Sequence, residues 1–479
     1  MIDAKMLIGG KMVDSVSGRR LDAINPATEE VIGSIPSASE ADVNLAVLAA
    51  EAASPAWQAL DVDGRAAYIL EVAKRLDAIA PEIAELEVKD TGHTIRRVRG
   101  DIGFASWFLR YYCGLGWMVK GETIPATPTG YHITMREPYG IAAKIVPFNH
   151  PVMFTSRLAA PLIAGNTVIM KAPSEASLSI LRLAEICAEV MPPGVVNIIS
   201  GTGKEAGDAI VRHPKIKRIG FIGSESTGLA IQETAAKAGV VKHLSLELGG
   251  KNPMIVFPDA DLSKVCPSVL GGMSFAWSGQ SCGSLSRVFL HKDIYDEAVE
   301  KIAALIDALK VGDPLSDASD MGSIIHKRQY EKVLHYIKAG AEDGARLVAG
   351  GVRPEGKEFE RGYWIRPTAY ADVMPDNRLF KEEVFGPVVS LIRWSDEDEV
   401  LEMANSLNLG LSGSVWTTNL NNALRTAQKL KTGYIWVNAV SEHYKAVPFG
   451  GYKNSGIGKE EGVDEIISYT EAKTINIII

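Results

Sequence analysis

Cysteine is scarce in this chain of 479 residues, which contains only four. They stand at positions 113, 187, 266 and 282, with no CxxC pair and no clustered histidines. This spacing argues against a disulfide framework and against a zinc site. We therefore expect no metal and a reducing, cytoplasmic setting. What remains open is whether one of the four is a nucleophile.

Long apolar runs and basic runs are also missing. The longest apolar stretch, residues 158–170, is broken by Pro161, Gly165 and Asn166, and residues 1–11 lack the pattern of a secretory signal. These absences predict no membrane span. Acidic residues outnumber basic ones by 58 to 50, for a net charge of -8, which argues against nucleic acid or anionic membranes as partners.

The composition is otherwise that of a folded protein. Hydrophobic residues make up 46% and charged residues 23% of the chain, enough apolar material for a large core. At roughly 150 residues per domain, the length corresponds to about three domains. No repeat or Pro/Ser linker separates them, so we expect them to be interwoven or tightly joined.

The first 110 residues are predicted to be mainly helical. Ser37 and Glu40, three positions apart, form a capping-box pattern before apolar residues at helical spacing, and the run 90–92 (Asp-Thr-Gly) predicts the end of a later helix. From residue 140 the pattern changes to short β-branched runs that alternate with Ala- and Leu-rich stretches. The expected strands are 141–146, 167–170, 195–199, 218–222 and 243–247.

This alternation predicts βαβ units and a parallel sheet that binds a ligand at the carboxyl ends of its strands. A second alternating region, from about 250 to 440, predicts another α/β lobe. Residues 119–138 and the apolar tail 474–479 are strand-like pieces outside both lobes. An exposed apolar strand usually pairs with something, so we expect a partner subunit there.

Cys282 lies in a loop of small residues, Ser-Gly-Gln-Ser-Cys-Gly-Ser, at 278–284. Small neighbours leave a thiol reachable by a substrate, but local sequence leaves nucleophile and inert thiol as equal alternatives. Cys113, Cys187 and Cys266 lie on apolar or helical segments and are expected in the core.

Glu247 stands between two leucines at the end of an expected buried strand and is followed by Gly249 and Gly250. Such a carboxylate would have a raised pKa and could act as a general base, or it could be paired with Lys251. The segments 201–203 and 223–228 each link a strand to a helix and could bind a pyrophosphate at the helix N-terminus. Neither segment has the GxGxxG spacing, so an ordinary structural turn remains almost as good an interpretation of each segment as a dinucleotide-binding loop.

Seven motifs occur in order along the chain. They are PFNHP at 147–151, KAPSE at 171–175, GFIGS at 220–224, LELGGK at 246–251, GQSC at 279–282, EEVFGP at 382–387 and PFGGYKNSG at 448–456. In this order they resemble the motifs of the aldehyde dehydrogenase superfamily of NAD(P)-dependent enzymes, and the resemblance covers essentially the whole chain. It implies an α/β fold with a Rossmann-type parallel-sheet cofactor lobe, an α/β catalytic lobe and a β oligomerisation arm.

The resemblance assigns roles to individual residues. It implies that Cys282 attacks the aldehyde, that the amide of Asn149 and the Cys282 N–H stabilise the oxyanion, and that Glu247 activates water to hydrolyse the thioester. It also implies NAD or NADP as cofactor. The implied cofactor contacts are Pro147, Phe148, Lys171, Ser174, Gly203, Gly223, Ser224, Leu248, Glu383 and Phe385.

Departures from the family pattern bear on specificity. NAD-selective members often carry Glu three residues after the ribose lysine, where this chain has Ser174 followed by Glu175, so NADP could be accepted. Arg157 lies where succinate-semialdehyde dehydrogenases place an arginine that binds the substrate carboxylate. With His150, His443 or Lys445 it could select an acid-bearing aldehyde, or it could be a salt-bridged helix residue.

The aromatic stretch 107–112 keeps aromatic aldehydes as a further alternative. We expect residues 1–118 and 139–248 to form the cofactor domain, 249–464 the catalytic domain, and 119–138 with 465–479 the arm of a homodimer or homotetramer. The expected reaction is oxidation of an aldehyde to its acid. Its alternatives are a CoA-acylating semialdehyde dehydrogenase, a non-catalytic binding or structural protein, and a cysteine hydrolase.

Overall fold

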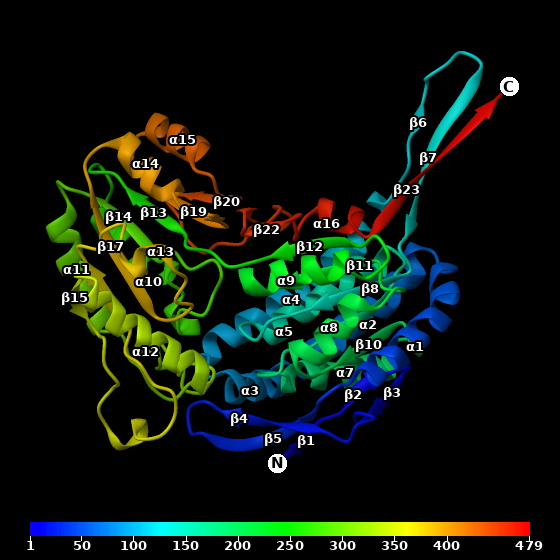
Figure 1. The fold of residues 1–479 in the computed structure, drawn as a ribbon, viewed down its shortest axis with the longest axis horizontal. Coiled ribbons are helices and arrows are strands. Elements are labelled where there is room, and N and C mark those ends of the chain that lie inside the picture. The colour runs from blue at the N-terminus through cyan, green and yellow to red at the C-terminus, as the bar shows by residue number, and fades with distance from the viewer.

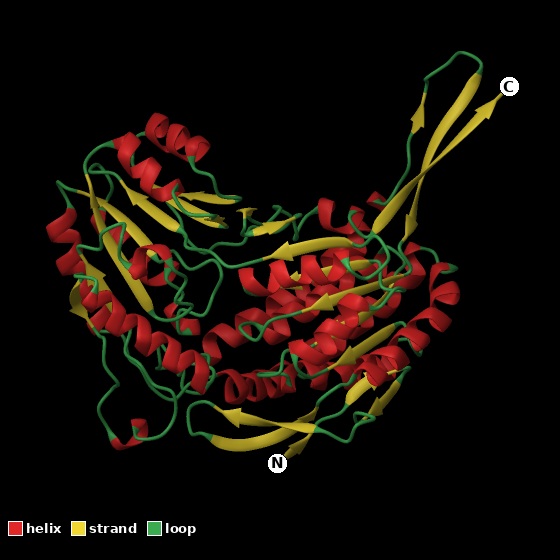
Figure 2. Cartoon of the chain, viewed as in Figure 1, coloured by secondary structure: helices red, strands yellow, loops and turns green.

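The computed structural model describes residues 1–479 and contains two α/β lobes and a projecting strand arm (Figure 1). Each lobe has a sheet with helices on both faces, as Figure 2 shows. The smaller sheet β1-β5-β4 (Ile2–Asp3, Glu30–Pro36 and Arg20–Asn25) lies near the N-terminus. The α/β class expected from the sequence is confirmed.

The first lobe is built on an eight-stranded sheet in the order β22-β12-β11-β8-β9-β10-β2-β3. Its five central strands are mutually parallel, as predicted. They are β8 (Ile141–Ile145), β9 (Thr167–Lys171), β10 (Val196–Ile199), β11 (Arg218–Ile222) and β12 (His243–Glu247). Antiparallel edges are added by β2 (Met6–Ile8) and β3 (Lys11–Val13) on one side and by β22 (Gly456–Ile457) on the other.

Alternate residues of these strands enter two separate cores, because successive side chains of a strand point to opposite faces. One core packs Ile141 and Ala143 against α1 (Glu40–Gln58), α8 (Asp208–Arg212) and α9 (Glu225–Ala236). The other packs Ala142 against a helical layer. That layer contains α2 (Val62–Ala78), α3 (Ala80–Thr91), α4 (Ile95–Leu115), α5 (Pro151–Phe154), α6 (Ala159–Ile163) and α7 (Leu178–Val190).

The prediction that the first 110 residues are mainly helical is confirmed by α1 to α4, although five short strands come first, in residues 2–36. The predicted position of the capping box is wrong. The capping box is made by Ser39 with Asp42, two residues after the predicted pair, because Asp42 Oδ2 accepts a 2.7 Å hydrogen bond from the Ser39 backbone. The predicted helix end is confirmed, since α3 stops at Gly92, whose φ of 75° is left-handed.

The second lobe has a seven-stranded sheet in the order β15-β16-β17-β14-β13-β19-β20, parallel except at β15. These strands are Arg346–Ala349, Thr368–Ala371, Val388–Trp394, Arg287–His291, Pro253–Val256, Ser412–Trp416 and Tyr434–Val437. Its helices are α10 (Leu262–Gly272), α11 (Tyr295–Asp307), α12 (Lys327–Glu342), α13 (Arg378–Lys381), α14 (Glu397–Asn405) and α15 (Leu420–Lys429). The sequence had indicated this lobe but not β13, β14, β15, β16, β19, α10 or α13.

The arm pairs distant parts of the chain. β23 (Thr470–Ile478) runs antiparallel to β7 (Gly130–Pro138), with Ile477 opposite Tyr131, and β6 (Thr123–Ile124) completes the sheet. This sheet projects from the first lobe, and the C-terminus lies at its tip (Figure 1). α16 (Val463–Ile467) precedes it. The short sheet β18-β21 (Leu409–Gly410 and Tyr452–Lys453) completes the fold. No helix is both long and apolar enough to span a bilayer.

Candidate active site

A cavity of about 830 Å³ lies at the carboxyl ends of the parallel strands of the first sheet. It is closed by residues of the second lobe, among them Cys282 and Glu383. Most of the predicted site residues line it: Pro147, Phe148, Asn149, Lys171, Ser174, Gly203, Gly223, Ser224, Glu247, Cys282, Glu383 and Phe385. Leu248, His150, Arg157 and His443 do not.

The Cys282 loop is held in a strained conformation. Ser274 and Ser278 have φ values of 58° and 55°, and a Cβ on Gly279 would lie 2.3 Å from the Gly386 carbonyl oxygen. Only glycine tolerates that approach at a positive φ. Asn252 Nδ2 donates to the Cys282 carbonyl at 2.8 Å, which fixes the far side of the loop. The other three cysteines are buried, as predicted, whereas the Cys282 residue retains partial exposure.

Asn149 is positioned by the same loop. Its Nδ2 donates to the Gln280 carbonyl at 3.0 Å, which uses one of the two amide hydrogens. The backbone N–H of Cys282 donates to no other residue. One amide hydrogen and one backbone N–H are therefore left to bind an oxyanion beside the thiol.

Glu247 ends β12 and is 6% exposed. Its Oε1 is fully enclosed and has no hydrogen-bond partner, and no ion pair joins it to Lys251, so the ion-pair alternative is wrong. Burial and then the nearby Glu460 raise the pKa of Glu247 well above its usual range. Burial and the charge of Glu247 likewise raise the pKa of the Cys282 thiol. Two proton acceptors of raised basicity thus share one poorly solvated wall of the cavity.

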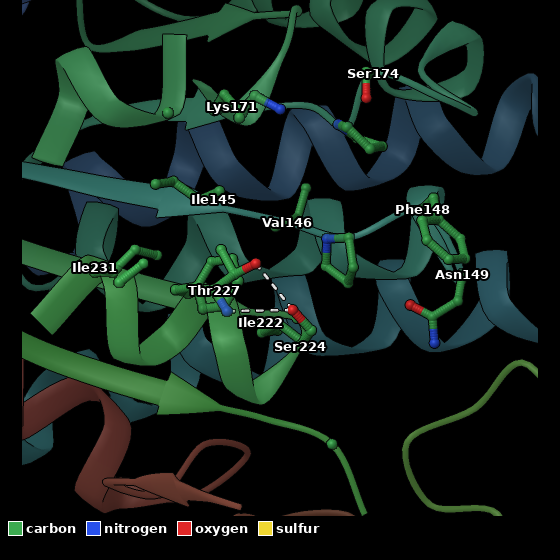
Figure 3. Close-up of a pocket in the computed structure, with 18 of the residues that line it drawn as sticks. Ile145, Val146, Phe148, Asn149, Lys171, Ser174, Ile222, Ser224, Thr227 and Ile231 are labelled. Atoms are coloured by element: carbon green, nitrogen blue, oxygen red, sulfur yellow. Dashed lines mark hydrogen bonds between the residues drawn. The ribbon is translucent and has the colours of Figure 1, made fainter. Parts of the chain in front are cut away.

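The inner part of the cavity is suited to phosphates. Ser224 caps the start of α9: its Oγ accepts from the Thr227 N–H at 3.3 Å and donates to Thr227 Oγ1 at 2.9 Å, as the dashed lines in Figure 3 show. A Cβ on Gly223 would meet the Phe221 ring at 2.4 Å, so the backbone is bare where the helix N-terminus faces the cavity. Exposed N–H groups at a helix start bind anions well. The segment after Gly203 forms one π-helical turn, Gly203–Gly207, before α8.

Lys171 and Glu383 supply polar groups at separate points of the cavity. Lys171, drawn to the left of Ser174 in Figure 3, is 4% exposed, and its Nζ makes no hydrogen bond or ion pair within the chain. Burial lowers the pKa of Lys171 to about 8. Glu383 is held by the Gly250 N–H, which donates to its Oε1 at 3.0 Å. An unpaired ammonium, a helix N-terminus and a fixed carboxylate fit the ribose hydroxyls and phosphates of a dinucleotide.

Glu175, which the sequence analysis placed beside Ser174, lines the cavity, accepts a 2.5 Å hydrogen bond from Ser174 Oγ and lies 3.9 Å from the Arg328 guanidinium. The structure also adds cavity residues that the motifs did not indicate. Among them are Lys204, Thr227, Ala230, Ile231, Thr234, Arg328, Gln329 and Lys332. The α9 members recur at helical spacing, which could have revealed the face that α9 turns toward the cavity, whereas Arg328 and Lys332 arrive from a lobe distant in sequence.

Arg157 lies in an interior ion cluster. Its guanidinium contacts Glu460 at 3.1 Å and Glu461 at 3.0 Å, and lies 3.8 Å from Glu465, while Lys144 Nζ donates to Glu460 at 2.9 Å. Burial opposes ionisation of Glu460, but Lys144 and Arg157 outweigh it and hold its pKa at about 2. These contacts agree with the alternative in which Arg157 is a salt-bridged structural residue. We therefore do not propose Arg157 as a ligand of a substrate carboxylate.

His443 and Lys445 occupy the loop that follows β20. His443 Nδ1 lies 3.0 Å from Glu461 Oε2, and its ring stacks on Tyr434. Lys445 Nζ lies 4.5 Å from the centre of the Trp107 ring on α4. His150 is bonded to Asp101 at 2.9 Å. These side chains therefore meet α4 and the ion cluster rather than the cavity.

A family model for the aldehyde dehydrogenase family matches residues 12–475. The chain belongs to the aldehyde dehydrogenase family. It is an NAD(P)-dependent enzyme that oxidises an aldehyde, as the resemblance predicted. It is 43% identical over 476 residues to aldehyde dehydrogenase tropH of Talaromyces stipitatus, covering 98% of this chain and 92% of that protein.

The enzyme is also similar to solved structures. PnpE from Pseudomonas sp. WBC-3, in complex with nicotinamide adenine dinucleotide, superposes with a TM-score of 0.97 at 37% identity, over 100% of this chain and 98% of the other. A 3,6-anhydro-L-galactose dehydrogenase in complex with NAP superposes with a TM-score of 0.96 at 30% identity, over 99% of this chain and 100% of the other. The aldehyde dehydrogenase, mitochondrial, of Leishmania tarentolae is 37% identical over 99% of this chain and 95% of its own.

Proposed function

We propose that Cys282 is the nucleophile, that Asn149 and the Cys282 N–H form the oxyanion site, and that Glu247 is the general base of a reaction whose product is the free acid. The observation that carries this proposal is the convergence of these groups on one cavity wall: an accessible thiol, an amide anchored to its loop, and a buried carboxylate with an unpartnered oxygen.

In this proposal the Cys282 thiolate adds to the aldehyde carbon, and the carbonyl oxygen becomes an oxyanion that accepts from the Asn149 amide and the Cys282 N–H. When bound, the dinucleotide accepts the hydride that leaves this carbon. The resulting thioester on Cys282 is attacked by a water whose proton Glu247 takes. The C–S bond then breaks, and the acid leaves with the thiolate restored.

Cofactor contacts follow from the same cavity. Lys171 would donate to a hydroxyl of the adenosine ribose, Gly223 and Ser224 would face the pyrophosphate, and Glu383 and Phe385 would contact the nicotinamide side, with Pro147, Phe148, Ser174 and Gly203 completing the walls. Leu248 would act indirectly, because its side chain occupies the space beside Gly228 on α9. Since Ser174 replaces the usual glutamate, the proposal includes both NAD and NADP.

The proposed units follow the sequence division: residues 1–118 and 139–248 bind the cofactor, 249–464 catalyse, and the arm associates. Tyr131, Ile133, Met135, Ile475 and Ile477 support association, since directly opposed residues share one face of the arm and the structure leaves them partly exposed. We propose a homodimer or homotetramer. Four free cysteines support a reducing compartment such as the cytoplasm.

The test is reduction of NAD and NADP, followed by absorbance, across carboxylated, aliphatic and aromatic aldehydes, with and without CoA. We expect turnover that needs no CoA and releases the acid, and we expect Cys282→Ala to abolish it. Cys266→Ala is the matched control, because Cys266 is buried on α10 and should leave turnover in place. Dependence on added CoA would instead favour the acylating alternative, and turnover by Cys282→Ala would contradict the assigned nucleophile.

A further inference from the structure

One face of α4 forms a wall beside the catalytic loops. Arg97, Asp101, Phe104 and Phe108 recur at helical spacing and so lie on one side of the helix. Each meets a different segment: the Trp277 ring, His150, His443 and Arg157, respectively. None of these α4 residues lines the dinucleotide cavity.

Two catalytic residues stand between this wall and the cavity. Asn149 and Cys282 line the cavity, but His150, which follows Asn149, and Trp277, five residues before Cys282, contact Asp101 on α4 instead. The α4 wall is therefore outside the dinucleotide cavity but contacts the segments that carry both groups. An aldehyde that reaches Cys282 from the side of α4 would meet this wall.

Asp101 holds His150 in one orientation. Asp101 Oδ2 accepts from Trp277 Nε1 at 3.2 Å and lies 2.9 Å from His150 Nδ1. An indole N–H can only donate, so Oδ2 acts as an acceptor and the bonded Nδ1 carries the hydrogen. In the neutral imidazole this leaves Nε2 as an acceptor. The ring is packed edge-on against Trp277 at 5.2 Å and Phe154 at 5.9 Å, so it cannot swing freely.

The acceptor is left over within the chain. His150 is 6% exposed, and its Nε2 makes no hydrogen bond to any residue. Nε2 is nevertheless not fully enclosed and retains some accessible surface. An oriented, nearly buried acceptor without a partner favours a ligand that brings a donor.

We propose that His150, oriented by Asp101, is a specificity-determining residue that accepts a hydrogen bond from a hydroxyl of the substrate. The substrate class is an aldehyde that carries a hydroxyl close to its carbonyl carbon, because His150 is the direct neighbour of Asn149, the proposed oxyanion donor. This inference rests on the proposed function and narrows its substrate.

The test compares aldehydes that differ only in the hydroxyl: glycolaldehyde with acetaldehyde, 3-hydroxypropanal with propanal, and 3-hydroxybenzaldehyde with benzaldehyde. We expect kcat/KM to be about tenfold higher for the hydroxylated member of at least one pair, as one added hydrogen bond predicts. His150→Phe, which keeps an aromatic ring, should bring that ratio close to one. His150→Gln, which restores an acceptor, should recover part of it.

His335→Phe, on the exposed side of α12, is the matched control and should keep the wild-type ratio. Equal kcat/KM within all three pairs, or an unchanged ratio in His150→Phe, overturns the inference. Thermal unfolding verifies that each variant is folded, and His150→Met replaces His150→Phe if the latter is not.

A binding measurement separates this inference from the proposed function. The Cys282→Ala protein is titrated with the same pairs, and affinity is followed by tryptophan fluorescence. If the wild-type enzyme reduces no dinucleotide with any aldehyde, the proposed function fails, but tighter binding of the hydroxylated member still supports the role of His150. Equal binding of both members overturns that role whatever the turnover.

Discussion

At the scale of single residues, the cavity contains ionisable groups whose charged forms are disfavoured by burial. Burial raises the pKa of both Glu247 and Cys282, and the nearby charge of Glu460 adds to the shift of Glu247 while that of Glu247 adds to the shift of Cys282. Lys171 responds in the opposite direction, since burial lowers the pKa of an ammonium. Opposite shifts of acids and bases in one cavity are typical of functional sites.

The pH dependence of hydrolysis should report Glu247. A raised pKa means that the basic, ionised form is lost already at a pH above the usual carboxyl range, so the rate of thioester hydrolysis should rise as pH rises through that raised pKa. Glu247→Gln should remove this rise and lower steady-state turnover about 10²- to 10⁴-fold.

The first turnover should survive in Glu247→Gln, because hydride loss precedes hydrolysis. Rapid-mixing absorbance should therefore show a burst of about one reduced dinucleotide per active site. Glu461→Gln is not a suitable control, since Glu461 pairs with Arg157, whereas the exposed Glu85 on α3 provides one in Glu85→Gln. A Glu247→Gln protein without a burst would contradict the assignment to hydrolysis.

Selection between the two dinucleotides should depend on Glu175. Its carboxylate lines the cavity beside Ser174 and would repel a 2′-phosphate. We expect Glu175→Gln to lower the KM for NADP about tenfold with little effect on NAD, because one repulsive charge is removed. Steady-state kinetics with both cofactors measure this. Equal effects on the KM for NAD and for NADP would show that Glu175 acts on binding in general.

The KM for NADP should also depend on Lys171. It should rise above pH 8, where Lys171 loses its charge.

At the scale of elements, buried charges join parts of the chain that the sheet order separates. Lys144 on β8 and Arg157, just before α6, meet Glu460, which precedes α16, and Glu465, which lies on α16. Burial and then the glutamates of this cluster raise the pKa of Glu247, so this carboxyl group is coupled to the joint between the first sheet and the C-terminal segment. Such a joint stabilises the fold only while every charge is matched.

Removal of one partner should therefore be costly. Arg157→Met leaves Glu460 with Lys144 alone and Glu461 with His443 alone, so the buried cluster gains net negative charge, and we expect a loss of about 3–5 kcal/mol in the free energy of unfolding. Arg99→Met, which removes an exposed pair with Asp317, should cost less than about 1 kcal/mol. Urea unfolding of both variants checks the difference. A similar loss in the free energy of unfolding for the two variants would contradict a structural role of Arg157. The effect of Arg157→Met on the oxidation of carboxylated aldehydes would then need to be measured.

At the scale of the whole molecule, two lobes meet at one cavity and an arm projects from the first. The first sheet presents the carboxyl ends of its strands, and the second lobe brings Cys282 and Glu383 to the same cavity. The arm stands away from both (Figure 1), and Tyr131, Ile133, Met135, Ile475 and Ile477 share one of its faces.

Charge on that face should prevent association. The double substitution Ile475→Lys and Ile477→Lys should convert the oligomer to a monomer, because desolvating the new ammonium groups opposes burial. Thr474→Lys, on the opposite face, is the matched control. Light scattering coupled to size exclusion measures the mass. An unchanged mass in the double variant, or a monomeric wild-type protein, would contradict the proposed arm.

The sequence alone determined the elements that depend on local order. β11 and β12 were predicted to the residue, because a short run with alternating apolar residues that ends near a glycine is typical of a buried strand. The family resemblance likewise predicted twelve of the residues that line the cavity, eleven of them within the motifs, since a motif keeps its residues together in one contiguous stretch of the chain.

Only the tertiary structure decided what depends on long-range contacts. It placed Arg157 among glutamates three hundred residues away, left Glu247 without Lys251, and brought Arg328 beside Glu175. It also joined Asp101 to both His150 and Trp277. Whether a charged or polar side chain pairs inside the protein or faces a ligand depends on which distant segments pack against it, and no local pattern contains that information.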